Sequence, residues 1–443
     1  MARSRRLILG IVVIALLLRL GAVAATTEFA PDTDAADFDR HGVSIAGGHG
    51  YPSSIAAGAG GPSAFRPPAF AHLLGATYTV TGVHSERRRW TGARGVEAVL
   101  GAATVGLIGL LALALWGAAP AVVASALAAV YPPFLLMESS LASETLFLPL
   151  VVGSVLAMLR YRSSGRLRWA IAAGAVAGLA GLTRSNGIIL LLPLAAGALT
   201  AFPWRSRNAL KGAAATVLAG LVAVAPWTIR NAAVMDAFVP VSTQAGYGLA
   251  GAYNHSARND ELQPAAWRPP AADPGYRAII EDPALGEVEV EKRLRSESRQ
   301  FITAHPAYVL EAGFMNTLRL AILRDRDLER AGAVDLGMNP TLSKASTPAF
   351  WAVALLAFAG LFTTAARRTP RFVWAVPALL LLTTVFIAAW TRYRIPADPF
   401  LIGLAALGLT QLSSVLRRLR RRGPASARTR PGSGRSRESR SSP

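Results

Sequence analysis

The chain has 443 residues, of which 52% are hydrophobic and 16% are charged. Soluble domains carry about 25% charged residues, so this composition excludes an ordinary soluble domain and predicts a membrane protein that crosses the bilayer several times. The net charge of +20 does not predict a nucleic-acid partner, because the positive residues of a membrane protein must first be located relative to the bilayer. The sequence contains no cysteine, which excludes disulfides, thiolate nucleophiles and cysteine-based metal sites.

The chain begins with a short basic segment, residues 1–6, and a first apolar span from Leu7 to Ala25 that only Arg19 interrupts. A basic start before an apolar run is also the pattern of a secretory signal peptide, which is the alternative for this segment. Residues 26–93 form the first polar loop. Within it the apolar run 69–80 is too short to cross about 30 Å of hydrocarbon, so it is predicted to be an interfacial or re-entrant helix.

Further apolar runs approach the ~20 residues that a transmembrane helix needs. They lie at about residues 96–116, 118–136, 142–159, 170–182, 187–202, 213–227, 349–366, 372–390 and 395–415. With the first span they predict an all-α bundle of about ten transmembrane helices, whose glycine and alanine favour close helix packing. The long polar segment 228–348 includes Leu310, Phe314, Leu318 and Ile322, which repeat at helical spacing. They predict an amphipathic helix lying on the membrane or on the protein core.

The placement of arginine predicts the orientation of the bundle, because cytoplasmic loops carry an excess of Lys and Arg. If ten spans alternate, the basic clusters at residues 3–6, 160–168, 205–211 and 367–371 fall on one side, as does the segment after residue 416. Both termini are therefore predicted to be cytoplasmic, with the cluster 87–89 as an exception on the outer side. The transmembrane domain, residues 1–416, is followed by residues 417–443, whose ten arginines predict a disordered cytoplasmic tail that contacts membrane lipids.

The first outer loop opens with four carboxylates, those of Asp32, Asp34, Asp37 and Asp39. They fit the solvated first turn of a helix, where negative charge meets the positive end of the helix dipole. Asp34 and Phe38 are four residues apart, so on a helix they share one face. In the alternative interpretation, a carboxylate held beside apolar surface at the membrane boundary is a general base with a raised pKa.

Arg66, in the same loop, is a candidate phosphate ligand. It precedes Pro67 and Pro68, and a proline pushes the residue before it toward an extended conformation, so the Arg66 side chain leaves a stiff backbone. Arginine binds phosphate bidentately and stays charged in a low dielectric. An ordinary loop arginine is the alternative.

Arg392 and Arg394 flank Tyr393 between the last two spans, on the predicted outer side. Positive charge at this position opposes the positive-inside bias and calls for an anionic partner, either a lipid phosphate or Asp398. Tyr393 is alternatively an interfacial anchor.

Glu144 opens a predicted span, and an ionisable group at that depth is a functional candidate. The alternative is a helix N-terminal carboxylate beside a capping Ser140 or Ser143. The same two interpretations apply to Arg184 and Asn186 at a tight outer turn and to Arg230 just past a span.

The order of these pieces resembles a known family. Asp34-Ala-Ala-Asp-Phe38, followed by Gly48-His-Gly-Tyr51 and Phe65-Arg-Pro-Pro68, is similar to the first outer loop of bacterial membrane glycosyltransferases of the GT-C class. Within that class the resemblance is to the protein O-mannosyltransferase-like and aminoarabinose-transferase-like enzymes. Later landmarks of the same family follow in order: Tyr131-Pro-Pro, Ser143-Glu-Thr-Leu-Phe147, Leu182-Thr-Arg-Ser-Asn-Gly187, Pro226-Trp-Thr-Ile-Arg-Asn231, Val239-Pro-Val-Ser-Thr243 and Arg392-Tyr-Arg-Ile-Pro396.

The resemblance implies a sugar transferase that uses a polyprenyl-phosphate-linked donor and inverts the anomeric carbon. It implies an aspartate base, matched first by Asp34 and second by Asp37, and a donor-phosphate ligand at Arg66. Arg392 and Arg394 are further candidates for the phosphate, and the other landmarks supply candidate substrate-binding residues: Tyr131, Glu144, Arg184, Asn186 and Arg230. The chain departs from the family pattern at Phe38, where tyrosine is frequent.

The sequence thus predicts an enzyme at the outer face of the cytoplasmic membrane of a bacterium. The predicted partners are the lipid-linked donor, membrane lipids and an acceptor that is a glycan, a lipid or a protein. No cofactor is predicted, and a divalent metal is possible without being indicated by ligand spacing. A transporter or lipid flippase without chemistry is the alternative, although such proteins place polar residues deep within several spans.

Overall fold

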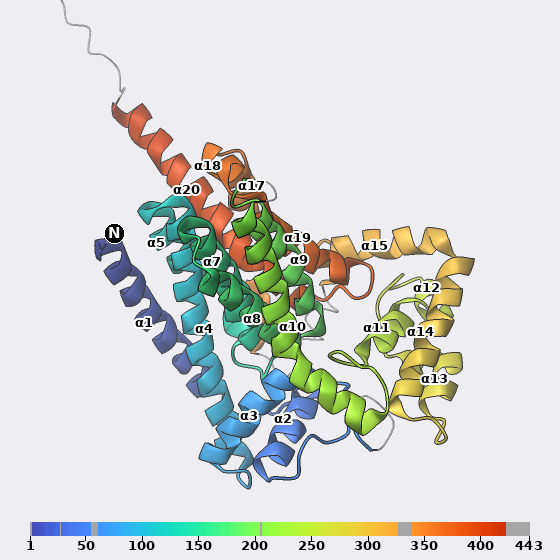
Figure 1. Cartoon of the computed structure of the whole chain (residues 1–443). Coiled ribbons are helices and arrows are strands. Elements are labelled where there is room, and N and C mark those ends of the chain that lie inside the picture. The colour runs from blue at the N-terminus through green and yellow to red at the C-terminus, as the bar shows by residue number, and fades with distance from the viewer. Residues whose placement is uncertain (1, 27, 55–60, 204–205, 327–338, 422–443) are drawn as a thin grey trace, which may run out of the picture.

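The computed structural model describes residues 2–26, 28–54, 61–203, 206–326 and 339–421, and within these ranges it contains helices and no strands. The helices form two bodies (Figure 1). A bundle of long helices holds both described ends of the chain, and a smaller unit of helices from the middle of the chain lies at its side. Most of the predicted tail, residues 422–443, lies outside the described residues, while the last helix continues to Arg421.

Among the residues that the structure describes, six helices are long and apolar enough to span a membrane. They are α1 (Ala2–Ala25), α4 (Glu86–Trp116), α7 (Glu144–Ser164), α10 (Arg207–Met235), α17 (Pro340–Leu361) and the helical segment that ends in α20 (Asp398–Arg421). Four predicted spans correspond to shorter apolar helices: α5 (Ala118–Ala129), α8 (Leu167–Thr183), η2 with α9 (Ser185–Leu190 and Leu191–Leu199) and α19 (Arg371–Val385). The predicted multi-span membrane bundle is therefore confirmed, with its elements in the predicted order.

Glycine lets the helices of the bundle approach one another closely. A Cβ atom on Gly174 of α8 would lie 1.9 Å from the Thr216 carbonyl oxygen of α10, and one on Gly360 of α17 would lie 2.0 Å from the Leu404 carbonyl oxygen of α20. Any side chain at these positions would force the helices apart. The expected close packing of small residues is thus present in two of the main helix pairs.

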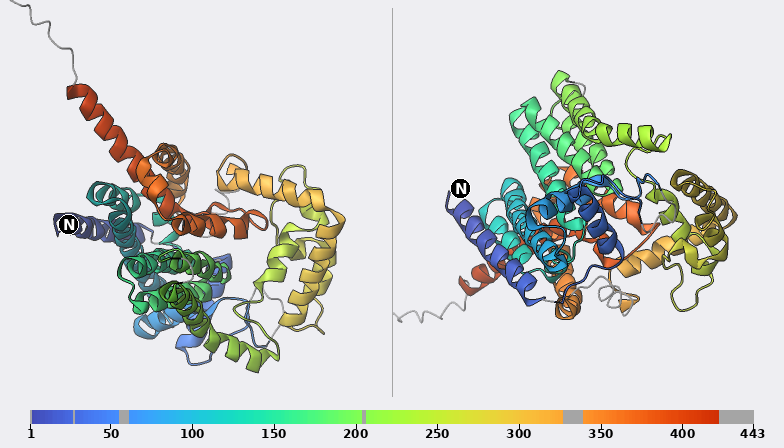
Figure 2. Two further views of the ribbon diagram at one scale, coloured as in Figure 1. Left: turned by 45° about the horizontal axis from the view of Figure 1, so that its top comes forward. Right: turned by 90° about the horizontal axis from the view of Figure 1, so that it is seen from below.

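The first polar loop folds into two short helices, α2 (Thr33–Ala46) and α3 (Pro68–Thr81), which lie across one end of the bundle (Figure 2). Phe38 and Phe70 meet edge to face in the small apolar core between them. Asp39 fixes the pair to α4, since both of its oxygens accept hydrogen bonds from Arg89, at 3.1 and 2.9 Å. The helix predicted over 69–80 is therefore present as α3.

The long loop folds into the smaller unit, formed by α11 (Gln244–Ala252), α12 (His255–Arg258), η3 (Pro270–Ala272), α13 (Pro274–Ile280), α14 (Glu287–Ala304) and α15 (Pro306–Leu320). The predicted apolar stripe begins on α15, where Leu310 is 73% and Phe314 is 60% exposed. Tyr308 and Ala312 fill the side of the helix that faces the unit. The sequence predicted that this stripe lies either on the membrane or on the protein core. Because Leu310 and Phe314 are exposed, these two residues do not pack on the core.

Arg19, the charge within the first span, is paired inside the bundle. Its Nε atom lies 2.6 Å from Glu138 Oε2, and both side chains are 1% exposed. The short helix α6 (Pro132–Met137) ends just before Glu138 and brings it to α1. This ion pair is closed to solvent and to ligands.

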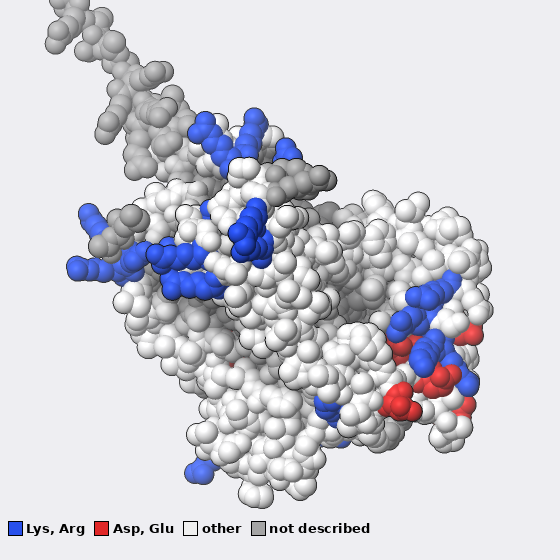
Figure 3. All heavy atoms as spheres, in the orientation of Figure 1, with Lys and Arg blue, Asp and Glu red and all other residues white. Residues whose placement is uncertain are grey.

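Basic side chains gather at the end of the bundle where the described chain begins and where α17, α18 (Thr364–Arg368) and α20 lie (Figure 3). The basic residues in the described parts of the predicted cytoplasmic clusters come from α1, α7, α8, α10, α18 and α19. The helices α2 and α3 lie at the opposite end. This charge distribution agrees with the orientation predicted from the arginine clusters.

Candidate active site

The site begins at the first turn of α2. Asp32 precedes this helix, and its side chain accepts a hydrogen bond from the Thr33 N–H at 2.7 Å, so this carboxylate serves as the expected helix cap. Asp34 follows in the first turn with 32% of its side chain exposed, whereas the Asp37 side chain is only 2% exposed. Of the two aspartates matched to the family base, Asp34 is the one that solvent reaches.

The Arg66 corner lies against this turn. Its guanidinium group places Nη2 2.7 Å from Asp34 Oδ1 and Nε 2.8 Å from Asp37 Oδ2. The group stacks over the rings of Phe38 and Phe65, each at 5.3 Å from the ring centroid. Asp34 and Phe38 therefore share one helix face as predicted, and Arg66 covers that face.

The backbone at this corner is stiff, as the sequence predicts. Pro67 precedes α3 in an extended conformation, with φ −60° and ψ 143°, and Pro68 opens the helix. The Tyr51 hydroxyl donates a hydrogen bond to the Arg66 carbonyl oxygen at 2.7 Å. Both the side chain and the carbonyl of Arg66 are thus fixed by partners from the first loop.

Arg392 reaches the same carboxylate from the other end of the chain. It lies in η4 (Thr391–Tyr393), and its Nη2 contacts Asp34 Oδ2. Its Nε lies 4.0 Å from Glu144 Oε1. Two guanidinium groups, from segments more than 300 residues apart, therefore converge on Asp34.

Glu144 and Arg184 extend the network into the bundle. Arg184, just after α8, places Nη1 2.6 Å from Glu144 Oε1, and its guanidinium carbon lies 5.4 Å from the centroid of the Tyr393 ring. Ser143 does not cap α7 with its side chain; its hydroxyl accepts a hydrogen bond from Arg184 at 3.1 Å. Glu144 is therefore the predicted carboxylate in the first turn of α7, but neither predicted serine caps the helix, since the Ser140 hydroxyl donates to the Met137 carbonyl oxygen.

The charges at the site hold Asp34 ionised. Burial raises the pKa of the Asp34 carboxyl, but the charges and hydrogen bonds of Arg66 and Arg392 outweigh burial and bring the pKa below its ordinary value. Burial likewise raises the pKa of Asp37, and Arg66 and Ser54 more than reverse that effect. The expected raised pKa of a base at this position is therefore wrong, since sequence spacing does not reveal two arginines around one carboxylate.

Three of the predicted site residues lie among other partners. Arg394, buried two positions after Arg392, places Nε 3.1 Å from Asp398 Oδ1, and the Tyr131 hydroxyl donates to the other oxygen of Asp398 at 3.0 Å. Asn186 donates a hydrogen bond to the Thr383 hydroxyl at 3.1 Å. These contacts join helices of the bundle.

Arg230, in the last two turns of α10, is held next to the Arg66 corner. Its Nη1 donates to the Ser63 carbonyl oxygen at 2.7 Å, and its guanidinium carbon lies 4.7 Å from the centroid of the Trp227 ring and 5.5 Å from that of Tyr51. Arg230 thus supports the loop that carries Arg66.

Glu287 is a neighbour of the site that sequence reasoning missed. It opens α14 in the smaller unit, is 4% exposed, and accepts one hydrogen bond from Ala64 of the first loop and one from Thr243. Its surroundings, Glu287-Val-Glu-Val-Glu291, have the alternation of a solvated helix start, so no local signal distinguishes Glu287 from its exposed neighbour Glu289.

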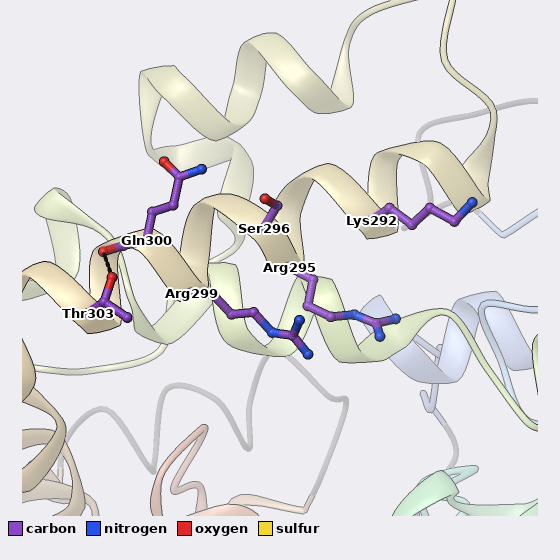
Figure 4. Close-up of a pocket in the computed structure, with 6 residues that line it drawn as sticks. All are labelled: Lys292, Arg295, Ser296, Arg299, Gln300 and Thr303. Atoms are coloured by element: carbon purple, nitrogen blue, oxygen red, sulfur yellow. Dashed lines mark hydrogen bonds between the residues drawn. The ribbon is translucent and has the colours of Figure 1, made fainter.

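A separate open groove of about 380 Å³ lies along the outer side of α14. Its lining is polar and rich in hydrogen-bond donors: Lys292, Arg295, Ser296, Arg299, Gln300 and Thr303 (Figure 4). One of these cations, Arg295, is already paired with Glu291. The groove contains none of the residues of the Asp34 network.

Comparisons with known protein families and solved structures found matches to part of the sequence and to the fold. Residues 65–229 match the family described as dolichyl-phosphate-mannose-protein mannosyltransferase. No match was found among curated protein sequences.

Among solved structures, the archaeal oligosaccharyltransferase AglB from Archaeoglobus fulgidus, in complex with an inhibitory peptide and a dolichol-phosphate, has 15% sequence identity and a TM-score of 0.55. The match covers 94% of this chain and 51% of that chain. The apo form of the Archaeoglobus fulgidus enzyme has 14% identity, a TM-score of 0.54 and the same coverage. The chain therefore spans about half the length of these oligosaccharyltransferases.

ArnT from Cupriavidus metallidurans bound to undecaprenyl phosphate has 16% identity and a TM-score of 0.42, with 92% of this chain and 77% of that chain covered. The family match and the AglB structures confirm the resemblance predicted from the sequence at the level of the fold and of residues 65–229.

Proposed function

We propose that this chain, which has the membrane fold of the GT-C class glycosyltransferases, transfers a sugar from a polyprenyl-phosphate donor to an acceptor at the outer face of the cytoplasmic membrane. The observation that carries the proposal is the Asp34 carboxylate held between Arg66 and Arg392. A base and two phosphate ligands are the groups that this reaction requires, and they meet at one end of a transmembrane bundle.

In the reaction, an acceptor hydroxyl attacks the anomeric carbon, and the bond from that carbon to the phosphate oxygen breaks. Asp34 takes the proton of the hydroxyl, as a general base does. The polyprenyl phosphate leaves with the bonding electrons, and Arg66 and Arg392 neutralise the charge that develops on it. Attack from the side opposite the phosphate inverts the anomeric configuration.

The ion pairs around Asp34 support a way in which the base becomes available. Arg66, Arg184 and Arg392 together balance the charges of Asp34, Asp37 and Glu144, so an incoming phosphate must compete with carboxylates for the guanidinium groups. A phosphate that draws Arg66 and Arg392 away from Asp34 removes the two charges that lower the pKa of this carboxyl, and the burial that raises it remains. Donor binding thereby converts a weak base into a stronger one.

The orientation of the bundle supports a site at the outer face. Basic side chains gather at the end that holds α1 and α18 (Figure 3), whereas α2 with Asp34 lies at the opposite end. By the positive-inside rule the basic end faces the cytoplasm. Both described ends of the chain then lie inside, and the donor phosphate is bound at the level of the outer headgroups.

The chemistry of the base gives the first test. Asp34→Asn removes the proton acceptor and is expected to reduce sugar transfer by about 10²–10⁴-fold. The assay uses the purified full chain, a radiolabelled polyprenyl-phosphate mannose or pentose and a membrane extract as the acceptor source. Asp32→Asn, which changes an exposed cap of the same helix, is the matched control and should retain transfer. Near-normal turnover by a folded Asp34→Asn variant would remove Asp34 from this role.

A further inference from the structure

We propose that Glu287 is a positioning residue for the donor-phosphate site: from the smaller helical unit it holds the stretch of backbone that aims Arg66. This inference rests on the proposed function and adds a residue from the long loop to it. Glu287 itself does not contact Arg66, so its effect is carried by the chain between residues 63 and 66.

The contacts of Glu287 bridge three distant segments. Its Oε1 accepts a hydrogen bond from the Ala64 N–H at 2.9 Å and another from the Thr243 hydroxyl at 2.7 Å. The Thr243 N–H donates in turn to the Ala64 carbonyl oxygen at 3.2 Å. Both backbone groups of Ala64 are thereby satisfied by residues that lie far away along the chain, and Glu287 is separated from Ala64 by 223 positions.

The neighbouring residues reinforce the same stretch. Arg230 donates to the Ser63 carbonyl oxygen at 2.7 Å. Phe65 packs edge to face on Tyr247 of α11 at 4.9 Å between ring centroids, and the Arg66 guanidinium stacks on the same Phe65 ring. The smaller unit therefore reaches Arg66 through two routes, the backbone at Ala64 and the ring of Phe65.

The contacts of Glu287 can affect the Arg66 side chain because they lie two residues before it in the chain. Ala64 is fully buried and stands two residues before Arg66, and the chain after Arg66 is fixed by Pro67 and Pro68. A buried backbone N–H must find a partner. If Glu287 is truncated, the buried Ala64 N–H loses its acceptor, and the stretch that leads into Arg66 loses one of the restraints that fix it.

The Glu287 carboxylate is also buried at this location. Glu287 is 4% exposed, and its Oε2 has no hydrogen-bond partner among the described residues. Arg230 lies close enough for the two charges to interact. Glu287 and Arg230 thus hold adjacent residues, Ala64 and Ser63, from two different helices.

The experiment measures the affinity of the purified full chain for undecaprenyl phosphate, together with the donor KM and kcat of sugar transfer. Glu287→Ala is expected to weaken lipid-phosphate binding and raise the donor KM about tenfold, the effect of losing a hydrogen bond to a charged group. Glu287→Gln keeps an acceptor oxygen and should lose less. Glu289→Ala, on the exposed side of the same helix, is the matched control and should bind like the wild type.

A double-mutant cycle separates positioning from general stability. If Glu287 acts through Arg66, Glu287→Ala has no further effect on lipid-phosphate affinity once Arg66→Ala is present. Fully additive losses, or unchanged affinity in Glu287→Ala, would overturn the inference. Should Glu287→Ala fail to fold, Glu287→Asp shortens the side chain by one methylene and withdraws the carboxylate from the Ala64 N–H, and an unchanged donor KM in that variant overturns the inference equally.

The same measurements distinguish failure of this inference from failure of the proposed function. If Arg66→Ala binds undecaprenyl phosphate as tightly as the wild type, the donor-phosphate assignment fails and the positioning role falls with it. If Arg66→Ala loses affinity while Glu287→Ala keeps it, only the role of Glu287 is wrong.

Discussion

Arg392 and Arg394 stand two residues apart in one short segment before α20, and the structure gives them different surroundings. Arg392 is 18% exposed in its side chain and shares the partly exposed Asp34 with Arg66. Arg394 is 5% exposed and is paired with Asp398, which is fully buried. We call the network of Arg392 open, because its partner Asp34 is partly exposed and can be reached by another ligand of the arginine. We call the network of Arg394 closed, because both Arg394 and Asp398 are buried.

The contacts of Arg394 explain why its network is closed. Its Nη1 donates to the Leu320 carbonyl oxygen at 2.7 Å, its guanidinium carbon lies 3.5 Å from the centroid of the Phe350 ring, and Tyr131 holds the second oxygen of Asp398. All of these partners belong to the protein, and displacing them would expose a buried charge. An arginine suits phosphate binding when its present partner is accessible, which is the case for Arg392 and not for Arg394.

The largest effect expected from the difference between Arg392 and Arg394 is on the free energy of unfolding. Arg394→Ala leaves the buried carboxylate of Asp398 without its cation and is expected to destabilise the protein by about 3–5 kcal/mol. Thermal unfolding of the detergent-solubilised chain measures the loss. The double variant Arg394→Met with Asp398→Leu removes both charges and should recover most of it. A fully stable Arg394→Ala variant would contradict the closed-pair interpretation.

Arg392→Ala is expected to act on donor binding instead. Removing one of two phosphate ligands should raise the donor KM about tenfold, or ~1.4 kcal/mol, with little change in the unfolding temperature because Asp34 keeps Arg66. Donor titrations in the transfer assay check this. The matched control is Arg87→Ala, an exposed arginine at the start of α4. Equal destabilisation by Arg392→Ala and Arg394→Ala would erase the distinction between the two networks.

The smallest expected effect is on pH dependence. The folded-state pKa of Asp34 lies below the ordinary value of 3.8, so the stability and basicity that this carboxylate contributes are present above that value and are lost as the pH falls through the lowered pKa. In Arg392→Gln one of the lowering charges is absent while burial persists. The acid limb of kcat/KM for the donor should therefore move to higher pH, and Arg394→Gln, measured in parallel, should leave the limb in place.

Much of the fold followed from the sequence. The apolar runs predicted the spans in order, because crossing a bilayer requires long stretches of uncharged helix. The interfacial helix α3 was predicted from a run that is too short to cross, and the stiff Arg66 corner from two consecutive prolines. Local rules were sufficient for these features, since length, hydropathy and backbone restriction act within one segment.

The sequence predicted the individual residues of the candidate site, but it did not predict which of them lie together in space. Asp34, Arg66, Glu144, Arg184 and Arg392 were all named from local signals, and the structure joins them in one network. The same signals named Tyr131, Asn186 and Arg394, which the structure assigns to contacts between bundle helices. The raised pKa expected for Asp34 failed for the same reason, since the second arginine comes from the far end of the chain.

By itself the sequence determined a helical membrane bundle, its basic end and a small set of charged residues at the other end, because hydropathy and charge placement are read one segment at a time. Only the tertiary structure decided that Arg392 meets Asp34 while Arg394 meets Asp398, and that Glu287 holds the Arg66 loop. The physical reason is that the energy of a buried charge depends on which partners surround it in space, and these partners lie hundreds of residues away along the chain.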